Sequence, residues 1–272
     1  MAPDGVKGDD ATWREEVADF APPVRVEPSP RWVRTILAGR TVGNSKRPML
    51  HVAYGRPIRP GSRKPELPCY FFPVEDVDMS ILEPADVRDG RQWWHADLDE
   101  RRVEYAAWAY DNPQGAVASL SGHVTFDWDA MDAWYEEAEE VYEHARDPQH
   151  RVDLIASSRR VDIEFEGRHL ASSERPHLLF ETHLPTRYYM PPEHVNFDLL
   201  EPSELVTRCP YKGTARFWSL ADAGKEGRNV AWSYPDPIPE NPRIKDLIAF
   251  YNERVDIIID GTRIDRPVTP WS

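Results

Sequence analysis

A short run in the second half of the chain gathers three reactive side chains. Cys209, Tyr211 and Lys212 place a thiol, a phenol and an amine within four positions, and Gly213 follows directly. A nearby cation lowers the pKa of a thiol and makes the sulfur nucleophilic, and a lysine three residues away on a tight loop is close enough to do this. We therefore predict that Cys209 and Lys212 are the catalytic residues.

Other roles for the same side chains stay open. The Lys212 ammonium can bind a carboxylate or a phosphate, and its amine can form a Schiff base if it is desolvated. Alternatively, Cys209 is a small buried side chain and Lys212 is merely solvated. Free cysteines are often buried, and no histidine lies close to Cys209 in the sequence to act as its base.

Aromatic and basic residues of the same half are candidates for ligand binding. Trp232 and Tyr234 are two residues apart, so they share one face of a predicted strand. They line a cavity or, as aromatic stripes more often do, a core. The predicted ligand-binding residues are Arg187, Tyr188, Tyr189, Tyr211, Trp218, Trp232 and Tyr234.

The charge of the chain limits its partners. The 272 residues carry a formal net charge of −14, whereas nucleic acids and anionic membranes attract basic surfaces. No apolar stretch approaches the roughly 20 residues that a membrane span needs. We therefore predict a cytoplasmic protein that binds neither nucleic acid nor membrane.

Motifs for common cofactors are missing from the sequence. The two cysteines, Cys69 and Cys209, cannot build a disulfide framework and have no CxxC or Cys/His spacing for zinc. There is no GxGxxG, Walker loop, GxSxG or HExxH. We predict neither a metal site nor a cofactor.

The chain also repeats itself. Residues 24–50 align with 152–178 at a constant offset of 128, with ten identities and no gap. After extra residues in the first copy the offset is 118, and after six missing residues it is 124, which aligns Trp94 with Trp218 and Trp108 with Trp232. The missing residues are those that would match the run from Cys209 to Gly213. This self-similarity indicates a tandem duplication.

Each copy is predicted to be mainly β (α+β). Val161, Ile163 and Phe165 alternate with acidic residues, which is typical of half-buried antiparallel strands. One helix is predicted in each copy, and in the second copy Asn241 can cap it. An acidic amphipathic linking helix is predicted over 129–146. Its apolar stripe consists of Met131, Trp134, Ala138, Val141 and Ala145. The predicted parts are an N-terminal tail (1–22), a first repeat (23–128), the linking helix (129–150) and a second repeat (151–272).

Five blocks of the second repeat carry a family resemblance. They are Arg187-Tyr188-Tyr189 with Pro191, Leu199-Leu200-Glu201-Pro202-Ser203, the run Cys209 to Gly213, Trp218-Ser219, and Ala231-Trp232-Ser233-Tyr234. In spacing and order they resemble DUF427, a family of domains of unknown function, and the first repeat resembles the same domain in degraded form. The resemblance implies a small β-barrel or tent-like fold similar to that of the Mss4-like proteins. Many of those relatives hold zinc with paired cysteines, which this chain lacks, so no metal is implied here.

Two functions follow from these observations. In the first, the second repeat binds a small, anionic molecule around Cys209 and Lys212, as a binding protein or as an enzyme. In the second, the repeats form a non-catalytic scaffold, and the stripe of residues 129–146 is buried inside the protein or forms a homo-oligomer interface.

Overall fold

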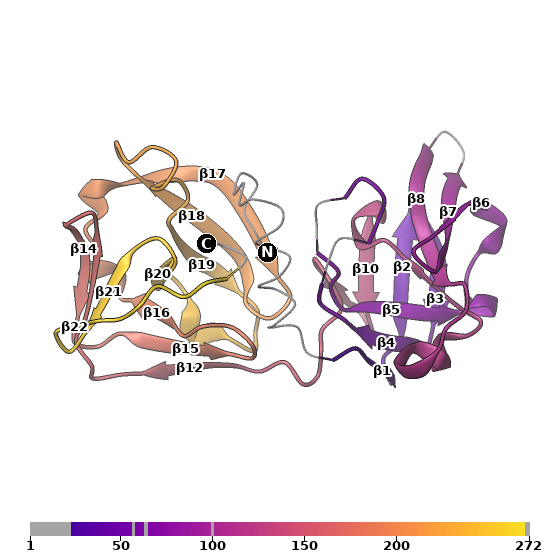
Figure 1. The fold of residues 1–272 in the computed structure, drawn as a ribbon, viewed down its shortest axis with the longest axis horizontal. Helices are drawn as coiled ribbons and strands as arrows, with labels where there is room; N and C mark the ends of the chain where they lie inside the picture. Colours follow the sequence, from indigo (N-terminus) through magenta and orange to yellow (C-terminus); the bar gives the residue numbers. More distant parts are fainter. Residues whose placement is uncertain (1–22, 56–57, 63–64, 99–100, 270–272) are drawn as a thin grey trace. The chain divides into compact units, whose positions relative to one another are not determined.

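The computed structural model describes residues 23–55, 58–62, 65–98 and 101–269, and the predicted tail lies outside these ranges. The described chain divides into two compact units between Asp147 and Pro148. Figure 1 shows each unit as an assembly of antiparallel strands. None of the helices among the described residues is long and apolar enough to cross a membrane.

The first unit contains two sheets. The seven-stranded sheet has the order β1-β4-β5-β9-β8-β7-β6, and the four-stranded sheet has the order β11-β10-β2-β3. The strands are β1 (Arg25–Pro28), β2 (Val33–Leu37), β3 (Arg40–Ser45), β4 (Met49–Val52), β5 (Cys69–Pro73), β6 (Leu82–Arg88), β7 (Arg91–Leu98), β8 (Arg101–Tyr110), β9 (His123–Phe126), β10 (Ala133–Glu136) and β11 (Glu139–Val141).

The second unit contains two sheets of the same sizes. Their orders are β12-β15-β16-β20-β19-β18-β17 and β14-β13-β21-β22. The strands are β12 (Val152–Ala156), β13 (Val161–Phe165), β14 (Arg168–Ser173), β15 (His177–Glu181), β16 (Arg187–Met190), β17 (Leu200–Cys209), β18 (Gly213–Leu220), β19 (Ala231–Pro237), β20 (Ile248–Phe250), β21 (Asp256–Ile259) and β22 (Thr262–Arg263).

The two units have one topology. When the strands are matched through the sequence repeat, the orders of the seven-stranded sheets are identical, and those of the four-stranded sheets also agree. The mainly β fold and the tandem duplication are therefore confirmed. Of the predicted barrel or tent-like forms, a closed barrel is not found among the described residues, because each sheet there is open, with two different edge strands that do not pair with each other.

Short turns shape the strand pairs. Val161, Ile163 and Phe165 are buried along β13, as their alternation predicts. The turn that follows has positive φ at Glu166 and at Gly167, as two-residue hairpins with the twist of the flanking strands require. The same pair of conformations recurs at the matching turn of the first unit.

Each seven-stranded sheet contributes residues to two separate buried clusters. In the second unit, Tyr188 and Ile248 pack with residues of the four-stranded sheet, whereas their chain neighbours Tyr189 and Ala249 pack in a separate cluster. Side chains alternate between faces along a strand. Neighbouring residues of this sheet therefore belong to different environments.

The predicted linking helix is wrong. Residues 133–141 instead form the β10–β11 hairpin, and β10 pairs with β2 over four residues. This hairpin takes the place that β21 and β22 take in the second unit. Backbone pairing with β2 and burial of Trp134 outweigh the helix propensity of the glutamate-rich segment.

The apolar stripe of this segment is buried inside the first unit. Met131, Trp134 and Ala145 belong to its core, and Val141 is also buried, whereas Ala138 is exposed. The stripe is thus used within its own unit. It leaves no continuous apolar face for a second chain, so the predicted oligomer interface at 129–146 loses its basis.

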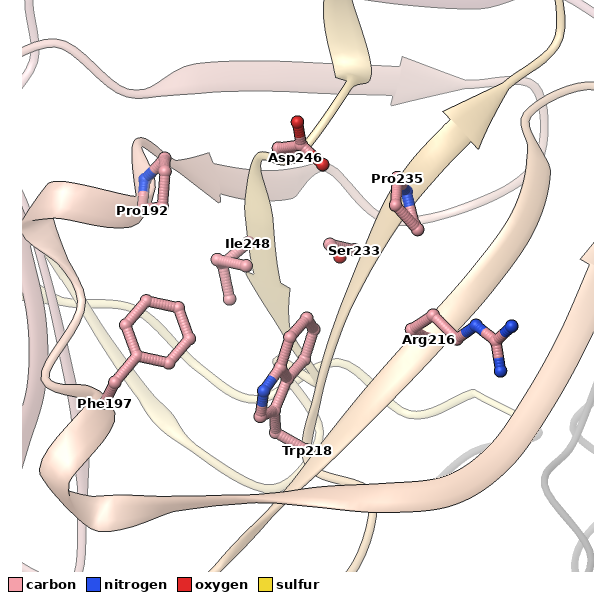
Figure 2. Close-up of a pocket in the computed structure, with 8 residues that line it drawn as sticks. All are labelled: Pro192, Phe197, Arg216, Trp218, Ser233, Pro235, Asp246 and Ile248. Carbon is pink, nitrogen blue, oxygen red and sulfur yellow. The ribbon is translucent and has the colours of Figure 1, made fainter.

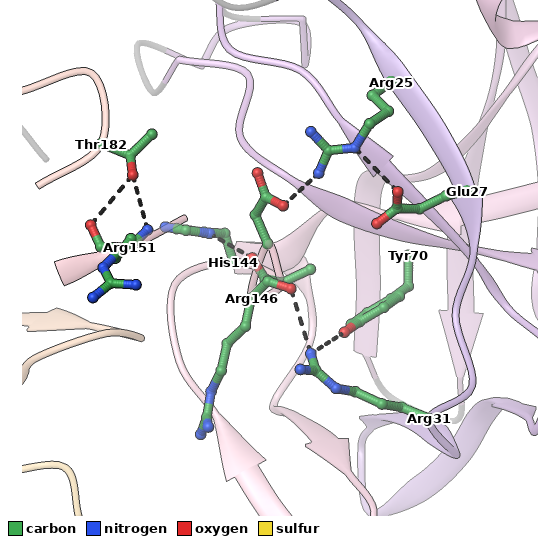
Figure 3. Close-up of polar contacts among 10 residues, drawn as sticks. Arg25, Glu27, Arg31, Tyr70, His144, Arg146, Arg151 and Thr182 are labelled. Carbon is green, nitrogen blue, oxygen red and sulfur yellow. Dashed lines mark hydrogen bonds and ion pairs between the residues drawn. The ribbon is translucent and has the colours of Figure 1, made fainter. Parts of the chain in front are cut away.

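Buried polar contacts hold the hairpin and the residues after it. Glu136 accepts a hydrogen bond from the Tyr70 hydroxyl at 2.7 Å and pairs with Arg31 at 2.9 Å. Arg31 also donates to Tyr70 at 3.2 Å and to the carbonyl oxygen of Arg146 at 3.4 Å (Figure 3). A residue that the helical pattern places on an outer acidic face is therefore a buried anchor.

The predicted helix from Asn241 is also wrong. It is reduced to one 3-10 turn followed by β20, and the Asn241 side chain does not cap it but donates to the Tyr211 carbonyl oxygen at 2.6 Å. In the described part of the chain all helices are such turns. They are η1 (Val74–Asp76), η2 (Met79–Ile81), η3 (Gly115–Leu120), η4 (Trp128–Ala130), η5 (Pro192–His194), η6 (Phe197–Leu199) and η7 (Pro242–Ile244).

Candidate functional site

The run from Cys209 to Gly213 forms the turn between β17 and β18. Gly213 has φ of 109°, and a Cβ atom there would lie 2.6 Å from the Asp236 carbonyl oxygen, so the turn requires glycine. The Ile238 amide donates to the Lys212 carbonyl oxygen at 3.2 Å. The turn is thereby fixed against the end of β19.

Lys212 belongs to a buried ionic network. Its ammonium contacts one oxygen of the Glu181 carboxylate, and His150 Nε2 lies 3.0 Å from the other oxygen. The His150 ring stacks on Tyr211 with centroids 4.1 Å apart. The cation predicted to meet a ligand is thus already paired with a carboxylate of the protein.

The electrostatics keep this pair charged. Burial acts to raise the pKa of Glu181, but the Lys212 charge and the contact with His150 lower it to about 2. Burial acts to lower the pKa of Lys212, but the Glu181 charge prevails and raises it. A Schiff base needs a neutral amine, so this geometry favours a structural or binding role for the ammonium.

Cys209 lies beside the network without being activated by it. Burial raises the pKa of its thiol, and the opposing effect of the Lys212 charge is smaller. The side chain packs against the aromatic cluster of this face. The thiol is therefore protonated at neutral pH, which argues against the nucleophile predicted from the sequence.

Arg187 is neutralised in the same way. Two of its nitrogens lie 2.6 and 2.7 Å from the two oxygens of Glu253, which also accepts a hydrogen bond from Thr269. The guanidinium lies 5.7 Å from the ring centroids of both Trp232 and Tyr251. Burial acts to raise the pKa of Glu253, but the hydrogen bonds from Arg187 keep it low.

The structure sorts the predicted residues by face of the sheet. On the Lys212 side, Trp232 Nε1 donates to the Tyr189 hydroxyl at 3.0 Å, and Tyr234 is buried beside them. Tyr188 and Trp218 pack on the opposite face. The predicted residues brought together on the first side are Arg187, Tyr189, Cys209, Tyr211, Lys212, Trp232 and Tyr234.

A pocket of about 360 Å³ opens on the opposite face, around Trp218. Figure 2 shows the indole of Trp218 in its centre and the ring of Phe197 turned toward it. The two rings meet edge to face, with centroids 6.0 Å apart. The pocket is lined by Pro192, Phe197, Arg216, Trp218, Ser233, Pro235, Asp246 and Ile248.

A family model for a domain of unknown function, DUF427, matches residues 25–137 and 153–261. The chain belongs to the DUF427 family. It carries two tandem DUF427 repeats, and each lies within one compact unit of the structure. No curated protein matches the chain.

Sequence reasoning missed most of the pocket of the second DUF427 repeat. Phe197 lies in the 3-10 turn η6 rather than in a strand. Arg216 and Ser233 share a face with Trp218, and the period of two would have identified them once the strands were placed. Asp246 comes from the turn before β20 and has no such signal.

Metal ligation finds no support among the described residues of the two DUF427 repeats. No group of three or more His, Cys, Asp or Glu side chains there is arranged to hold a metal ion. The chemistry of the second repeat is thus divided between a packed ionic cluster on one face and an open, mainly apolar pocket on the other.

Proposed function

We propose that the second DUF427 repeat binds a small molecule in the pocket around Trp218. The ligand carries a flat apolar group, which lies against Trp218 and Phe197, and a carboxylate or phosphate, which meets Arg216. The pocket itself is the observation that carries this proposal. Its volume of about 360 Å³ falls within the range of roughly 300–1,000 Å³ usual for ligand sites.

The lining supports a flat apolar group. Trp218 and Phe197 offer two ring surfaces, and Pro192, Pro235 and Ile248 add aliphatic contacts. Phe197 is 39% exposed, although aromatic side chains are usually covered. A ligand ring on these surfaces would remove apolar area from water at about 25 cal/mol per Å².

The charges at the rim support an anionic group. Within the described chain, the exposed side chain of Arg216 makes no ion pair or hydrogen bond, unlike Arg187 and Lys212. A free guanidinium can bind a carboxylate or phosphate with two parallel hydrogen bonds. Asp246 is the acidic group at the rim, so a hydroxyl or amine on the ligand has an acceptor there.

Binding is favoured over catalysis at this pocket. Its lining contains no thiol, amine or imidazole, and Cys209 and Lys212 belong to the cluster on the other face. The Mss4-like fold and the cytoplasmic location stay predictions.

Ligand-observed NMR with indole-3-acetate, indole and tryptamine tests the proposal. We expect indole-3-acetate to bind more tightly than indole or tryptamine. Trp218→Ala should abolish binding of all three, and Arg216→Gln should weaken indole-3-acetate about tenfold, or about 1.4 kcal/mol, without affecting indole.

Trp94→Ala is the matched control, since Trp94 is the counterpart of Trp218 in the first repeat. It should leave binding unchanged. The proposal fails if none of the three probes binds, or if Trp218→Ala and Trp94→Ala have equal effects on binding by folded protein.

A further inference from the structure

The Trp218 pocket contains a hydroxyl group that the protein itself does not use. Ser233 is only 3% exposed, yet it lines the pocket, and Figure 2 shows it near the middle of the lining residues. Among the residues that the structure describes, its hydroxyl makes no hydrogen bond. Polar groups of buried residues are normally paired, so this hydroxyl is available to a bound molecule.

The Ser233 hydroxyl belongs to the same part of the pocket as its cation. Arg216 on β18 pairs directly with Ser233 on β19, and both line the pocket. Side chains that lie directly opposite each other on antiparallel strands have Cβ atoms about 4.5–5.5 Å apart. A carboxylate held by the guanidinium of Arg216 can therefore accept a further hydrogen bond from Ser233.

Asp246 adds a carboxylate at a backbone position that favours glycine. Its φ is 60°, in the left-handed region, and its amide donates to the Tyr234 carbonyl oxygen at 3.2 Å. Aspartate tolerates this conformation better than most residues, but glycine adopts it without strain. The side chain is exposed and, within the described ranges, makes no ion pair or hydrogen bond. Its carboxylate is thus free to accept a hydrogen bond from a ligand.

The matching positions of the first repeat carry none of these three groups. The alignment of the repeats places Gln92, Ala109 and Gly122 opposite Arg216, Ser233 and Asp246 respectively. Gln92 and Ala109 pair with each other in the same way, and Gly122 is also left-handed, with φ of 71°. The first repeat therefore forms the same backbone without the polar side chains. Since the fold does not require them, they indicate a ligand of the second repeat.

The charges of the lining suit a zwitterion. Arg216 and Asp246 are the two ionisable residues that line the pocket, and in the described part of the chain they form no ion pair with each other. A ligand with one carboxylate and one ammonium meets an opposite charge at each of them. A phosphate dianion would instead leave excess negative charge beside Asp246. The lining thus favours a carboxylate with an amine over a phosphate.

We propose that the ligand of this pocket is a free aromatic amino acid, an inference that rests on the function proposed above. Its carboxylate accepts hydrogen bonds from Arg216 and Ser233, and its ammonium donates to Asp246. Its ring lies against Trp218 and Phe197. In a peptide, an amide replaces one of the two charged groups on the same carbon atom, so the free amino acid is the better match.

Calorimetric titration of the full chain with three indole compounds tests this proposal. Indole-3-propionate has the skeleton of L-tryptophan without the amine, and tryptamine has it without the carboxylate. We expect L-tryptophan to bind about tenfold more tightly than either, since each analogue loses one hydrogen bond between charged groups. If indole-3-propionate binds as tightly as L-tryptophan, the amino acid is overturned while the proposed function stands. If no indole compound binds, both are overturned.

Variants locate the recognition of the amine. Asp246→Asn keeps a residue that tolerates the left-handed backbone, and it should weaken L-tryptophan about tenfold without affecting indole-3-propionate. Asp222→Asn is the matched control, because Asp222 is exposed, has φ of 59° and does not line the pocket. It should leave the binding of both compounds unchanged. Equal losses in the two variants would overturn the role of Asp246.

Ser233→Ala tests the recognition of the carboxylate. It should weaken L-tryptophan and indole-3-propionate alike, by about fivefold, and leave tryptamine unchanged. A loss that is equal for all three compounds would overturn the role of Ser233, because it would indicate a general change of the pocket.

Discussion

Lys212 and Arg187 are buried cations, each with a carboxylate of its own. Taking an ion out of water costs several kcal/mol, which its partner offsets only when the geometry is good. Both partners, Glu181 and Glu253, are almost fully buried and make further hydrogen bonds, from His150 and Thr269 respectively. The pairs are thus internally complete, and their main effect is on the stability of the second repeat.

Removing the carboxylate partner of Lys212 should reveal how much the pair contributes to the stability of the second repeat. Glu181→Gln keeps the size of the side chain but leaves Lys212 as an uncompensated buried cation, and we expect the free energy of unfolding of the second repeat to fall by about 3–5 kcal/mol at pH 7. Glu181→Gln combined with Lys212→Met should recover most of this loss. Urea unfolding followed by hydrogen exchange of second-repeat peptides measures both.

The same pair makes this stability depend on pH. Lys212 lowers the pKa of Glu181 from 4.5 to about 2 against the effect of burial, so the contribution is complete above about pH 4.5 and is lost as the pH falls toward 2. The difference between the parent and Glu181→Gln should shrink over this window. Arg175→Gln breaks the exposed pair with Glu193 and should cost under about 1 kcal/mol. A difference that stays constant down to about pH 2.5 would contradict this account.

At the scale of elements, the matching hairpins of the two repeats make different demands on glycine. Gly213 is the first residue of β18 and Gly90 directly precedes β7, and both have positive φ. A Cβ atom at Gly213 would strike the backbone of Asp236 and Pro237, whereas one at Gly90 would meet nothing within 4 Å. Gly213→Ala should therefore lower the free energy of unfolding by more than about 2 kcal/mol, and Gly90→Ala by only about 1 kcal/mol.

Thermal unfolding of the two variants, monitored repeat by repeat through hydrogen exchange, measures this difference. Equal losses would show that the φ angle alone matters and that the close approach to β19 is relaxed without cost. The comparison isolates the second-repeat turn because the control changes the same residue type in the matching hairpin.

The strand β13 was predictable because its residues alternate, and the repeat alignment predicted the duplicated topology. The β10–β11 hairpin could not be predicted from the sequence, because the spacing of Trp134 and Val141 fits a helix as well as it fits these two strands. Pairing with β2, more than ninety residues earlier, decides between them. The predicted site residues lie on two faces of the sheet, which also became clear only once the strands were placed. Tyr188 and Tyr189 are neighbours in the chain but lie on opposite faces of β16.

For the whole molecule, the four apolar clusters each draw their residues from a single repeat. The duplication has therefore produced two cores, with different polar groups added to each. The first repeat holds Cys69 and His51, and the second holds Lys212 and Glu181 on the same face of the matching sheet. The first repeat therefore lacks the run from Cys209 to Gly213 but has polar groups of its own, Cys69 and His51.

Separate cores predict separate responses to a core substitution. Trp134 is 2% exposed and stacks on Trp128 with centroids 4.4 Å apart, in the core of the first repeat. Trp134→Ala should lower the free energy of unfolding of the first repeat by about 3–5 kcal/mol, because a large cavity remains. Hydrogen exchange of second-repeat peptides should stay unchanged, and Glu140→Gln, an exposed change in the same hairpin, should affect neither repeat. Light scattering should show the same mass for Trp134→Ala and the parent, because the indole is buried within its own repeat. A change of mass with intact first-repeat protection would instead restore this segment as an interface between chains.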